Sequence, residues 1–562
     1  MRRSLAIIGG GLAGIAAAET AVQRGFKVDL FEWSRVLGGR AASVFDPVAD
    51  DWLDNGQHVA LGCCKEFLAL NTRLGLSDFF EQKNSIPFAQ TDGKHWVIAP
   101  TSFLPESWQL LPAFLRIPLL TLRQRISTVF ALRKLGKSEQ NSNRQKNSQQ
   151  NNLSDDFFAK WLKSENVSSK CIEKFWEPLI LSSLCDTVDN VAFDAVQKVV
   201  RDGFMTGQSG LTIHIPKKPL RTIYHDKTSE KLKSIGVNLH FLSRVTSLRW
   251  EFLSRQDHST TNHVCPNNND NNDNEHNPTT ENDDDNLNVT NKINDEADNN
   301  SNDNDNNDDK DQDNVEQFYG NVSDDVSGGT DVTGLGVVQP DQSSSKIPVV
   351  TGLEFSDGVV RSFDRYILAV PAFRAREILE ASELETFSDS LGLAGFEPGA
   401  ITSVHLWLSR RLLPDDYSHS ALVGGIGQFL FCTKSIESRI GGFYHVVLIS
   451  ASHRILSELE LASAGATILV ERVMQQLEST FKNDNKVNLL HHRVTTYFEA
   501  VFSPHPLVYS HRPVQKTPFI NFSIAGDWTQ TGWPSTLEGA VRSGLLAVDS
   551  IDYDNNIHSK GE

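Results

Sequence analysis

Short apolar runs separated by small residues predict a strand, a helix and a second strand at the start of the chain. Leu5 to Ile8 is an apolar run of the length typical of a buried strand. The alanine-rich segment Ala13 to Gly25 predicts a helix, and Lys27 to Phe31 predicts the second strand. A strand, a helix and a strand in this order form the unit of a parallel sheet, which indicates the α/β class.

The same pattern continues in the middle and at the far end of the chain. Asn521 to Ala525 predicts a short strand before a helix that opens near Thr536. Three further segments are rich in β-branched and apolar residues and predict strands: Gly236 to Trp250, Val350 to Phe355 and Tyr366 to Val370. The chain has 562 residues, more than one hydrophobic core normally supports, so we expect more than one domain.

Two segments lack this apolar pattern. Residues 137–152 form a linker rich in Ser, Asn and Gln, and residues 256–341 are dominated by Asn, Asp and Ser. The longer segment predicts disorder, because it has too few apolar residues to offset chain entropy. Since predicted strands flank it, we interpret it as an enlarged β-hairpin loop, whose closure entropy grows slowly with length. A docking tail for a partner is the alternative interpretation.

The acidic segment also carries the net charge of the protein. Residues 256–341 hold 22 Asp and Glu and two Lys, a net charge of −20, against −18 for the whole chain. The rest of the chain is therefore close to neutral, and it has no basic stripe with interleaved aromatic residues that would predict nucleic-acid binding. Six cysteines without CxxC spacing predict neither a disulfide framework nor a metal site.

The N-terminus imitates a secretory signal, with Arg2 and Arg3 before an apolar run. We favour the strand interpretation of that run, which predicts a cytoplasmic protein. No segment reaches the ~18 consecutive apolar residues of a membrane span. Thr101 to Leu135 is apolar but interrupted by prolines and arginines. Two interpretations of it stay open: core helices of a domain, or a surface in peripheral contact with the inner face of a membrane.

Three glycines follow the first predicted strand in GxGxxG spacing: Gly9, Gly11 and Gly14. This spacing supplies a tight turn, close backbone approach to a pyrophosphate and close packing of helix on strand, with the phosphates at the helix N-terminus. Glu32 follows the second predicted strand, where a carboxylate accepts hydrogen bonds from ribose hydroxyls and disfavours the extra phosphate of NADP. The sequence therefore predicts a dinucleotide site.

The run Leu37-Gly38-Gly39-Arg40 resembles the second glycine-arginine fingerprint of the amine oxidase and carotenoid desaturase flavoprotein superfamily. This resemblance implies FAD as the cofactor, with Gly39 and Arg40 at the pyrophosphate, where a guanidinium suits phosphate geometry. It also implies that the backbone of Val245 meets the adenine.

The far end of the chain resembles the other half of that cofactor site. Gly526 and Asp527 follow a predicted strand, and the segment Thr536 to Gly544 (TLEGAVRSG) opens a helix. The resemblance implies that Asp527 bonds the ribityl chain and that Thr536 and Leu537, at the helix N-terminus, face the flavin pyrimidine. A positive helix end suits negative charge on reduced flavin.

The superfamily resemblance also implies a fold class, namely α/β with a Rossmann-like FAD-binding domain, an α+β substrate domain and an amine-oxidase-like arrangement. We expect a discontinuous FAD-binding domain in residues 1–85, 205–255, 345–385 and 515–553. Residues 86–204 and 386–514 are expected to form the substrate domain. The linker and the disordered acidic insertion would interrupt these domains.

Three motifs resemble the narrower hydroxysqualene dehydroxylase family: Asp54 to His58 (DNGQH), Lys174 to Leu179 (KFWEPL) and Gly526 to Thr536 (GDWTQTGWPST). This resemblance implies FAD-dependent reductive loss of the hydroxyl of hydroxysqualene, giving squalene and oxidised FAD. The substrate would be a C30 polyprenyl lipid, and the apolar segments Phe103 to Leu120 and Val404 to Leu412 are candidates for lining its site.

The proton donor for that reaction would come from Glu177, Asp54 or His58, which lie in the family-like motifs. Each also has a structural interpretation. Either carboxylate serves equally well as a hydrogen-bonding anchor, and the imidazole as a satisfied core side chain. No second nucleotide motif indicates what re-reduces the flavin.

Three other functions stay open at this point. A carotenoid desaturase or isomerase shares the FAD fingerprints but transfers hydride in the opposite direction. An amine oxidase would usually present an aromatic pair and a lysine near the flavin, and the spacing of Tyr497 and Tyr509 fits such a pair poorly. A non-catalytic flavin-bound scaffold would use the acidic segment as an interaction arm.

Overall fold

The computed structural model describes residues 2–137, 157–254, 346–432, 439–457, 465–482 and 486–556. All of them belong to one compact unit, residues 1–258 and 340–562. The predicted linker, apart from Lys137, and the predicted acidic insertion lie outside the described residues.

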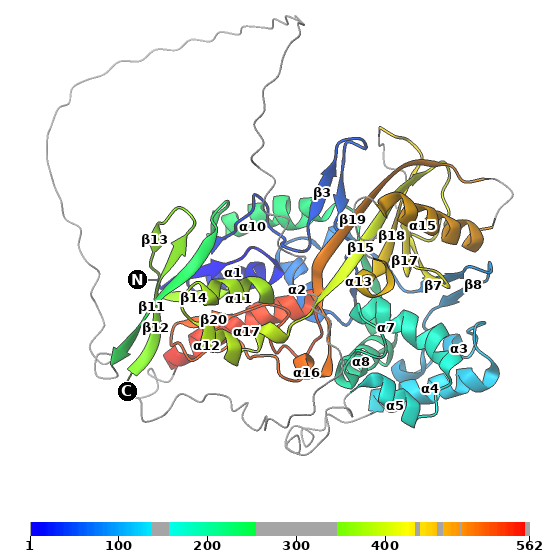
Figure 1. The fold of residues 1–562 in the computed structure, drawn as a ribbon, viewed down its shortest axis with the longest axis horizontal. Coiled ribbons are helices and arrows are strands. Elements are labelled where there is room, and N and C mark those ends of the chain that lie inside the picture. Colours follow the sequence, from blue (N-terminus) through cyan, green and yellow to red (C-terminus); the bar gives the residue numbers. More distant parts are fainter. Residues whose placement is uncertain are drawn as a thin grey trace, which may run out of the picture. The chain divides into compact units, whose positions relative to one another are not determined.

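A five-stranded parallel sheet contains the first and the last strand of the chain, in the order β10-β2-β1-β14-β20. Its strands are β1 (Ser4–Ile8), β2 (Lys27–Phe31), β10 (Asn238–His240), β14 (Arg365–Leu368) and β20 (Phe522–Ile524). The predicted strands are confirmed. Strand β1 from the start of the chain and β20 from its end both pair with β14, so the sheet brings the two ends of the chain close together (Figure 1).

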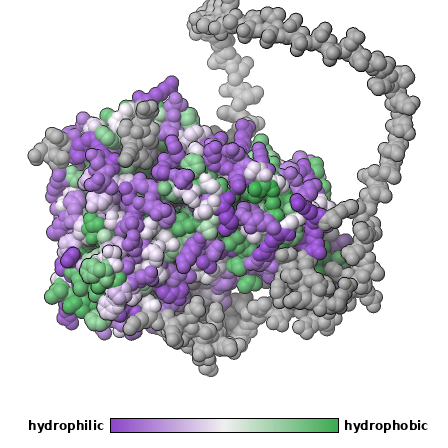
Figure 2. Space-filling view, turned by 180° about the vertical axis from the view of Figure 1, so that it is seen from behind, coloured by the Kyte–Doolittle hydropathy of each residue, from purple (hydrophilic) through white to green (hydrophobic). Residues whose placement is uncertain are grey.

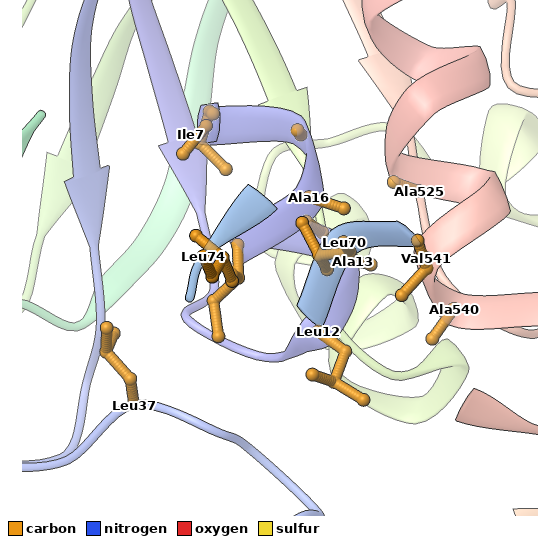
Figure 3. Close-up of a cluster of buried hydrophobic side chains, with 14 of the residues drawn as sticks. Ile7, Leu12, Ala13, Ala16, Leu37, Leu70, Leu74, Ala525, Ala540 and Val541 are labelled. Atoms are coloured by element: carbon orange, nitrogen blue, oxygen red, sulfur yellow. The ribbon is translucent and has the colours of Figure 1, made fainter. Parts of the chain in front are cut away.

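Three helices share one hydrophobic core with this sheet. These are α1 (Leu12–Gln23), α2 (Lys65–Arg73) and α17 (Leu537–Asn556). Figure 3 shows Ala13 and Ala16 of α1 in one cluster with Ala540 and Val541 of α17. A side chain on Gly544 of α17 would overlap the carbonyl oxygen of Ala13. Close packing of α1 and α17 therefore joins the first and last parts of the chain.

The predicted hairpin around the acidic insertion is confirmed by its two strands. Strand β11 (Val245–Ser254) pairs antiparallel with β12 (Lys346–Phe355), which pairs with β13 (Val360–Arg361). The last pair in the register is Ser254 with Lys346, so the insertion leaves and re-enters the fold at neighbouring positions.

A second sheet of seven strands runs in the order β19-β15-β18-β17-β16-β7-β8. Neighbouring strands are antiparallel except for the parallel pair β16 and β7. The strands are β7 (Ile86–Gln90), β8 (His95–Ile98), β15 (Pro398–Leu408), β16 (His419–Val423), β17 (Phe429–Cys432), β18 (Phe443–Ser450) and β19 (Leu489–Phe502). Apolar residues of this sheet form one core with α15 (Ala466–Thr480).

Short helices around the fully buried Trp176 form a separate core. They are η2 (Glu106–Trp108), α3 (Leu111–Phe114), α4 (Leu122–Lys137), α5 (Phe158–Ser164), α6 (Ser169–Cys171), η4 (Ile172–Trp176), α7 (Glu177–Leu184), α8 (Phe193–Val199), η5 (Val200–Phe204) and α9 (Gly207–Leu211). The prolines in the segment from Thr101 to Leu135 lie before, in the first turn of or between its helices, η2, α3 and the longer α4. None of the helices in the described ranges is long and apolar enough to cross a membrane.

Smaller elements connect these layers. They are β3 (Ser43–Asp46), β4 (Asp51–Asp54), β5 (Ala60–Leu61), η1 (Ser77–Phe79), β6 (Phe80–Lys83), β9 (Ile213–Pro216), η6 (Thr222–Lys227), α10 (Thr228–Ser234), α11 (Ala372–Glu380), α12 (Glu385–Ser390), η8 (Leu393–Gly395), α13 (Ser452–Ile455) and α16 (Pro506–Tyr509). The hairpin of β3 and β4 matters most for the site, because it joins the Gly39-Arg40 motif to the motif that starts at Asp54.

Candidate active site

The glycine turn lies between β1 and α1 at the carboxyl edge of the parallel sheet. The amide of Gly9 donates to the carbonyl of Phe31 at 2.8 Å, which ties the turn to β2. A side chain on Gly14 would overlap the carbonyl oxygen of Gly9, so this position packs the helix on the turn. A Cβ on Gly11 would meet only the Cα of Gly39, at 3.9 Å. The geometry thus leaves room for a ligand at Gly11 and none at Gly14.

Glu32 lies next to this turn, at the end of β2. Its carboxylate accepts from the amide of Gly10 at 2.7 Å and from the amide of Ser34 at 2.9 Å. Ser243 also donates its amide to the carbonyl of Glu32 at 2.9 Å. That contact brings the start of β11, and with it the buried Val245, to the side of Glu32. The residues predicted for the adenosine end of the cofactor are therefore neighbours.

The half-buried Arg40 and the buried Asp527 form an ion pair between the two ends of the chain. Arg40 also donates Nη1 to the carbonyl of Ala500 on β19, at 3.1 Å, and Asp527 accepts from the hydroxyl of Ser535. Burial alone would raise the pKa of Asp527, but the charge and hydrogen bond of Arg40, with the bond from Ser535, hold it below its usual value. Asp527 is therefore ionised at neutral pH.

Helix α17 starts beside this ion pair. Thr536 caps it, since its hydroxyl accepts from the amide of Gly539 at 3.1 Å. Gly526 donates its amide to Ser543 of the same helix at 2.8 Å. Residues 535–537 thus place the positive end of α17 next to Asp527. The predicted positions at both ends of the cofactor meet around one edge of the sheet.

Arg512 holds the loop from Asp527 to Trp533, a role that sequence reasoning missed. Its buried guanidinium donates to the carbonyl of Asp527 at 3.3 Å and to that of Trp533 at 2.6 Å. It also lies over the ring of Tyr509, 4.4 Å from the centroid. An isolated arginine before a proline has no informative spacing, so no signal in the sequence would have found it.

Asp54 lies at the end of β4 and begins the DNGQH motif. Its Oδ1 accepts from the hydroxyl of Ser43 at 2.7 Å and from the amide of Leu220 at 2.8 Å. Burial raises the pKa of Asp54 to about 7, although these two hydrogen bonds oppose the rise. Both bonds end on Oδ1, so Oδ2 has no hydrogen-bond partner among the described residues. The carboxyl carries its proton up to near-neutral pH.

His58 lies close to Arg40 and is neutral. Its Nδ1 lies 2.7 Å from the carbonyl oxygen of Gly56, which places the ring proton on Nδ1. Burial and then the charge of Arg40 lower the pKa of His58. The carbonyl of Asn55 accepts from Ser403 of β15 at 3.1 Å, so this motif also touches the seven-stranded sheet.

Glu177 has a different environment, at the start of α7 in the helical core. Its carboxylate accepts from the amide of Val188 at 3.0 Å. Burial, and after it the charges of Asp189 and Asp186, raise its pKa. In the described part of the chain no hydrogen bond or ion pair links Glu177 to Arg40, Asp54 or His58, so these contacts fit the anchor interpretation.

Strand β15 presents opposite faces, which changes the interpretation of Val404 to Leu412. Its Val404, Leu406 and Leu408 belong to the core under α15. On the other face, His405 lies 2.7 Å from the hydroxyl of Tyr444 and 3.2 Å from that of Thr495. Burial lowers the pKa of His405 to about 3, so the ring is neutral. The segment thus contains a buried, hydrogen-bonded histidine among apolar residues, and sequence reasoning missed this histidine.

Asp54 makes a testable contribution to stability. Its pKa rises from near 4 in the unfolded chain to about 7 in the fold. A raised carboxyl pKa stabilises the fold below the unfolded value, and the stabilisation disappears as pH rises through the folded value. We expect roughly 4 kcal/mol of stability to be lost over that range and the loss to vanish in Asp54→Asn. Urea unfolding at a series of pH values measures the free energy of unfolding of the wild type and of Asp54→Asn. The same pH dependence in both proteins would contradict the raised pKa of Asp54.

A parallel sheet with a glycine turn, an acid after its second strand and a C-terminal helix at the same edge defines a dinucleotide-dependent oxidoreductase of the flavoprotein class. The family model for flavin containing amine oxidoreductases matches residues 12–267 and 317–552. The chain belongs to this family. It is an FAD-dependent oxidoreductase, and the predicted fold class and cofactor are confirmed.

Two curated relatives match different shares of this chain. Hydroxysqualene dehydroxylase of Zymomonas mobilis subsp. mobilis is 22% identical over 545 residues, 97% of each chain. The 15-cis-phytoene desaturase of an Oncidium hybrid cultivar is 28% identical over 214 residues, which is 35% of this chain and 35% of the desaturase. The chain therefore spans about a third of the desaturase.

Solved structures share the fold at low identity. An oxidoreductase from Methanosarcina mazei has a TM-score of 0.59 at 12% identity and covers 97% of this chain and 100% of its own. Putrescine oxidase bound to putrescine has a TM-score of 0.57 at 10% identity and covers 98% and 99%. At such identities the likeness concerns the fold alone. No ring contact between described residues joins Tyr497 to Tyr509 as an aromatic pair.

Proposed function

We propose that this protein catalyses the reductive dehydroxylation of hydroxysqualene to squalene. The observation that carries the proposal is the similarity to a hydroxysqualene dehydroxylase over 97% of both chains. The DNGQH motif adds chemical support, because it contains a half-buried carboxyl whose pKa is raised to about 7. Loss of a hydroxyl as water needs such a proton donor.

The FAD site of this proposal uses the residues described above. Gly11 and the start of α1 would receive the pyrophosphate, Glu32 the adenosine ribose, and Val245 the adenine through its backbone. Arg40 and Asp527 would lie along the middle of the cofactor, with Gly526, Thr536 and Leu537 at its flavin end. The donor set fits, because it combines backbone amides at a helix N-terminus, one guanidinium and two carboxylates. Bound and reduced, FAD supplies a hydride.

Asp54 is the proton donor that we propose. Its Oδ2 is free to hold the proton, while Ser43 and Leu220 fix the carboxyl through Oδ1. Transfer of that proton to the allylic hydroxyl breaks the carbon–oxygen bond and releases water, which leaves a delocalised cation on the lipid. His58 is neutral and close to the guanidinium of Arg40, so it adds no positive charge beside that cation. Glu177 keeps the role of an anchor.

Phytoene desaturation is the second candidate. The local similarity to a 15-cis-phytoene desaturase, 28% over 214 residues, favours it. A desaturase removes hydrogen from its lipid and needs oxidised cofactor, whereas the proposed reaction needs reduced cofactor. The direction of electron flow therefore separates the two functions. The weaker third candidate, amine oxidation, draws only on the shared family.

One anaerobic experiment tests the proposal. The FAD-loaded protein is reduced with dithionite and given hydroxysqualene, and squalene is measured together with the return of oxidised flavin absorbance. We expect one squalene for each flavin oxidised. Oxidised protein with phytoene serves as the second arm. Desaturated product there, with no squalene in the first arm, would overturn the proposal in favour of the desaturase.

Two matched variants test the proton donor. In Asp54→Asn the amide has no acidic proton, so we expect single-turnover flavin oxidation by hydroxysqualene to slow by roughly 10²–10⁴-fold. In the wild type the rate should fall as pH rises past about 7. The control, Glu177→Gln, keeps the anchor and should react at the wild-type rate. Slow reaction in the control alone, with full FAD content in both variants, would assign the proton to Glu177.

A further inference from the structure

Helix α4 carries apolar side chains on two sides. One side, which includes Ala131, Leu132 and Leu135, is buried in the helical core. The other side exposes 66% of Leu122, 43% of Ile126 and 69% of Phe130. These three residues are four positions apart, so they form one row along the helix. Folding of this unit does not need that row, because the opposite side already supplies the core contacts.

The segment before α4 extends the row into a larger patch. Phe103 is 84% exposed and Trp108 is 40% exposed. The guanidinium of Arg133, near the end of α4, lies 3.5 Å from the ring centroid of Trp108, which joins η2 to α4. Figure 2 shows a hydrophobic area at the lower left, where Figure 1, turned by 180°, places α3 and α4. Exposed apolar areas of this kind mark interaction sites.

The charges around the patch are predominantly basic. Residues 101–137 contain six Arg and Lys and a single acid, Glu106, and α4 itself contains no acid. Lys134 is paired with Glu165, and Arg125 binds the carbonyls of Leu115 and Leu120. Arg116 and Arg123 are exposed and have no hydrogen-bond or ion-pair partner among the described residues. Two unpaired guanidinium groups therefore flank the apolar row.

We propose that this face docks on the surface of an anionic lipid bilayer. The face is defined by Phe103, Trp108, Arg116, Leu122, Arg123, Ile126 and Phe130. A helix that lies in the plane of a bilayer inserts large apolar side chains between the acyl chains and places basic groups at the phosphates. The apolar side chains that would insert are those of Phe103, Leu122 and Phe130. The basic groups at the phosphates would be Arg116 and Arg123. A protein partner would need acidic side chains placed opposite these two arginines. An anionic bilayer presents negatively charged headgroups over its whole surface. The proposal does not depend on the proposed reaction.

Vesicle sedimentation of the full-length, FAD-loaded protein tests the proposal. Vesicles of phosphatidylcholine with phosphatidylglycerol are compared with vesicles of phosphatidylcholine alone, at low and high salt. We expect binding to the mixed vesicles that weakens with salt. Leu122→Ser with Phe130→Ser should reduce binding by about tenfold or more on both vesicle types, because apolar burial is lost. Arg116→Glu with Arg123→Glu should reduce binding to the mixed vesicles only.

The control removes exposed apolar side chains from a different surface. Phe252→Ser with Val360→Ser changes the β11, β12 and β13 sheet and should bind vesicles like the wild type. All variants alter exposed side chains, and their FAD content and melting temperature are checked first. Failure of the wild type to bind either vesicle would overturn the proposal. So would a wild-type dimer in solution that the Leu122 and Phe130 changes dissociate without affecting vesicle binding, since this face would then join two copies.

Discussion

Gly14→Ala is expected to destabilise the fold strongly and to lower its melting temperature. The added methyl group would overlap the backbone carbonyl of Gly9, and neither the turn nor α1 can move away. The turn is tied to Phe31, and α1 is packed against α17. Overpacking of this kind costs about 1–3 kcal/mol or more. Thermal melting of protein prepared without FAD measures the loss, and we expect a melting temperature far below that of the wild type.

Gly11→Ala is the matched variant. Its methyl group would meet only the Cα of Gly39, at an ordinary contact distance of 3.9 Å. The protein without FAD should therefore melt like the wild type, whereas FAD affinity should fall because the methyl group occupies the space of the pyrophosphate. Flavin absorbance after dialysis measures this affinity. Normal FAD retention in Gly11→Ala would contradict the placement of the pyrophosphate at this turn.

Local patterns predicted most of the parallel sheet because each of its elements is recognisable from adjacent residues. The strand at Leu5, the glycine turn and the acid at Glu32 form one uninterrupted unit. The hairpin around the acidic insertion was predictable for a similar reason, since both of its strands have β-branched sequences. The distant C-terminal half of the site, Asp527 and Thr536, was found only through its resemblance to a known superfamily.

Contacts between distant segments could not be predicted. Arg512 acts through two backbone carbonyls, which any residues provide, so its partners have no sequence signature. His405 appeared inside an apolar run, and its partners, Tyr444 and Thr495, are contributed by two other strands of the sheet. Glu177 and Asp54 looked equivalent in the sequence. Their different surroundings arise from the helical core and from the β3–β4 hairpin, respectively.

The ion pair of Arg40 and Asp527 should show separable effects on stability and on FAD binding. Arg40→Met removes the ion-pair partner of the buried Asp527 carboxylate and leaves only Arg512 as a positive charge nearby. Breaking a buried pair in this way costs about 3–5 kcal/mol. The cost should be greatest near neutral pH. It should shrink as pH falls toward about 4, because burial, no longer opposed by Arg40, raises the pKa of Asp527 above its value in the unfolded chain and lets the carboxylate take up a proton.

The double variant Arg40→Met with Asp527→Asn decides whether the pair serves only the fold. Without FAD, the double variant should recover most of the stability that Arg40→Met loses, because the buried carboxylate that lost its partner is replaced by a neutral amide. If both side chains also contact the cofactor, FAD affinity will stay low in the double variant and in each single variant. Recovery of FAD affinity together with stability would mean that the pair only joins the ends of the chain. Urea unfolding and flavin titration on the same four proteins separate the two outcomes, since the fold needs the charges to cancel whereas FAD needs each group itself.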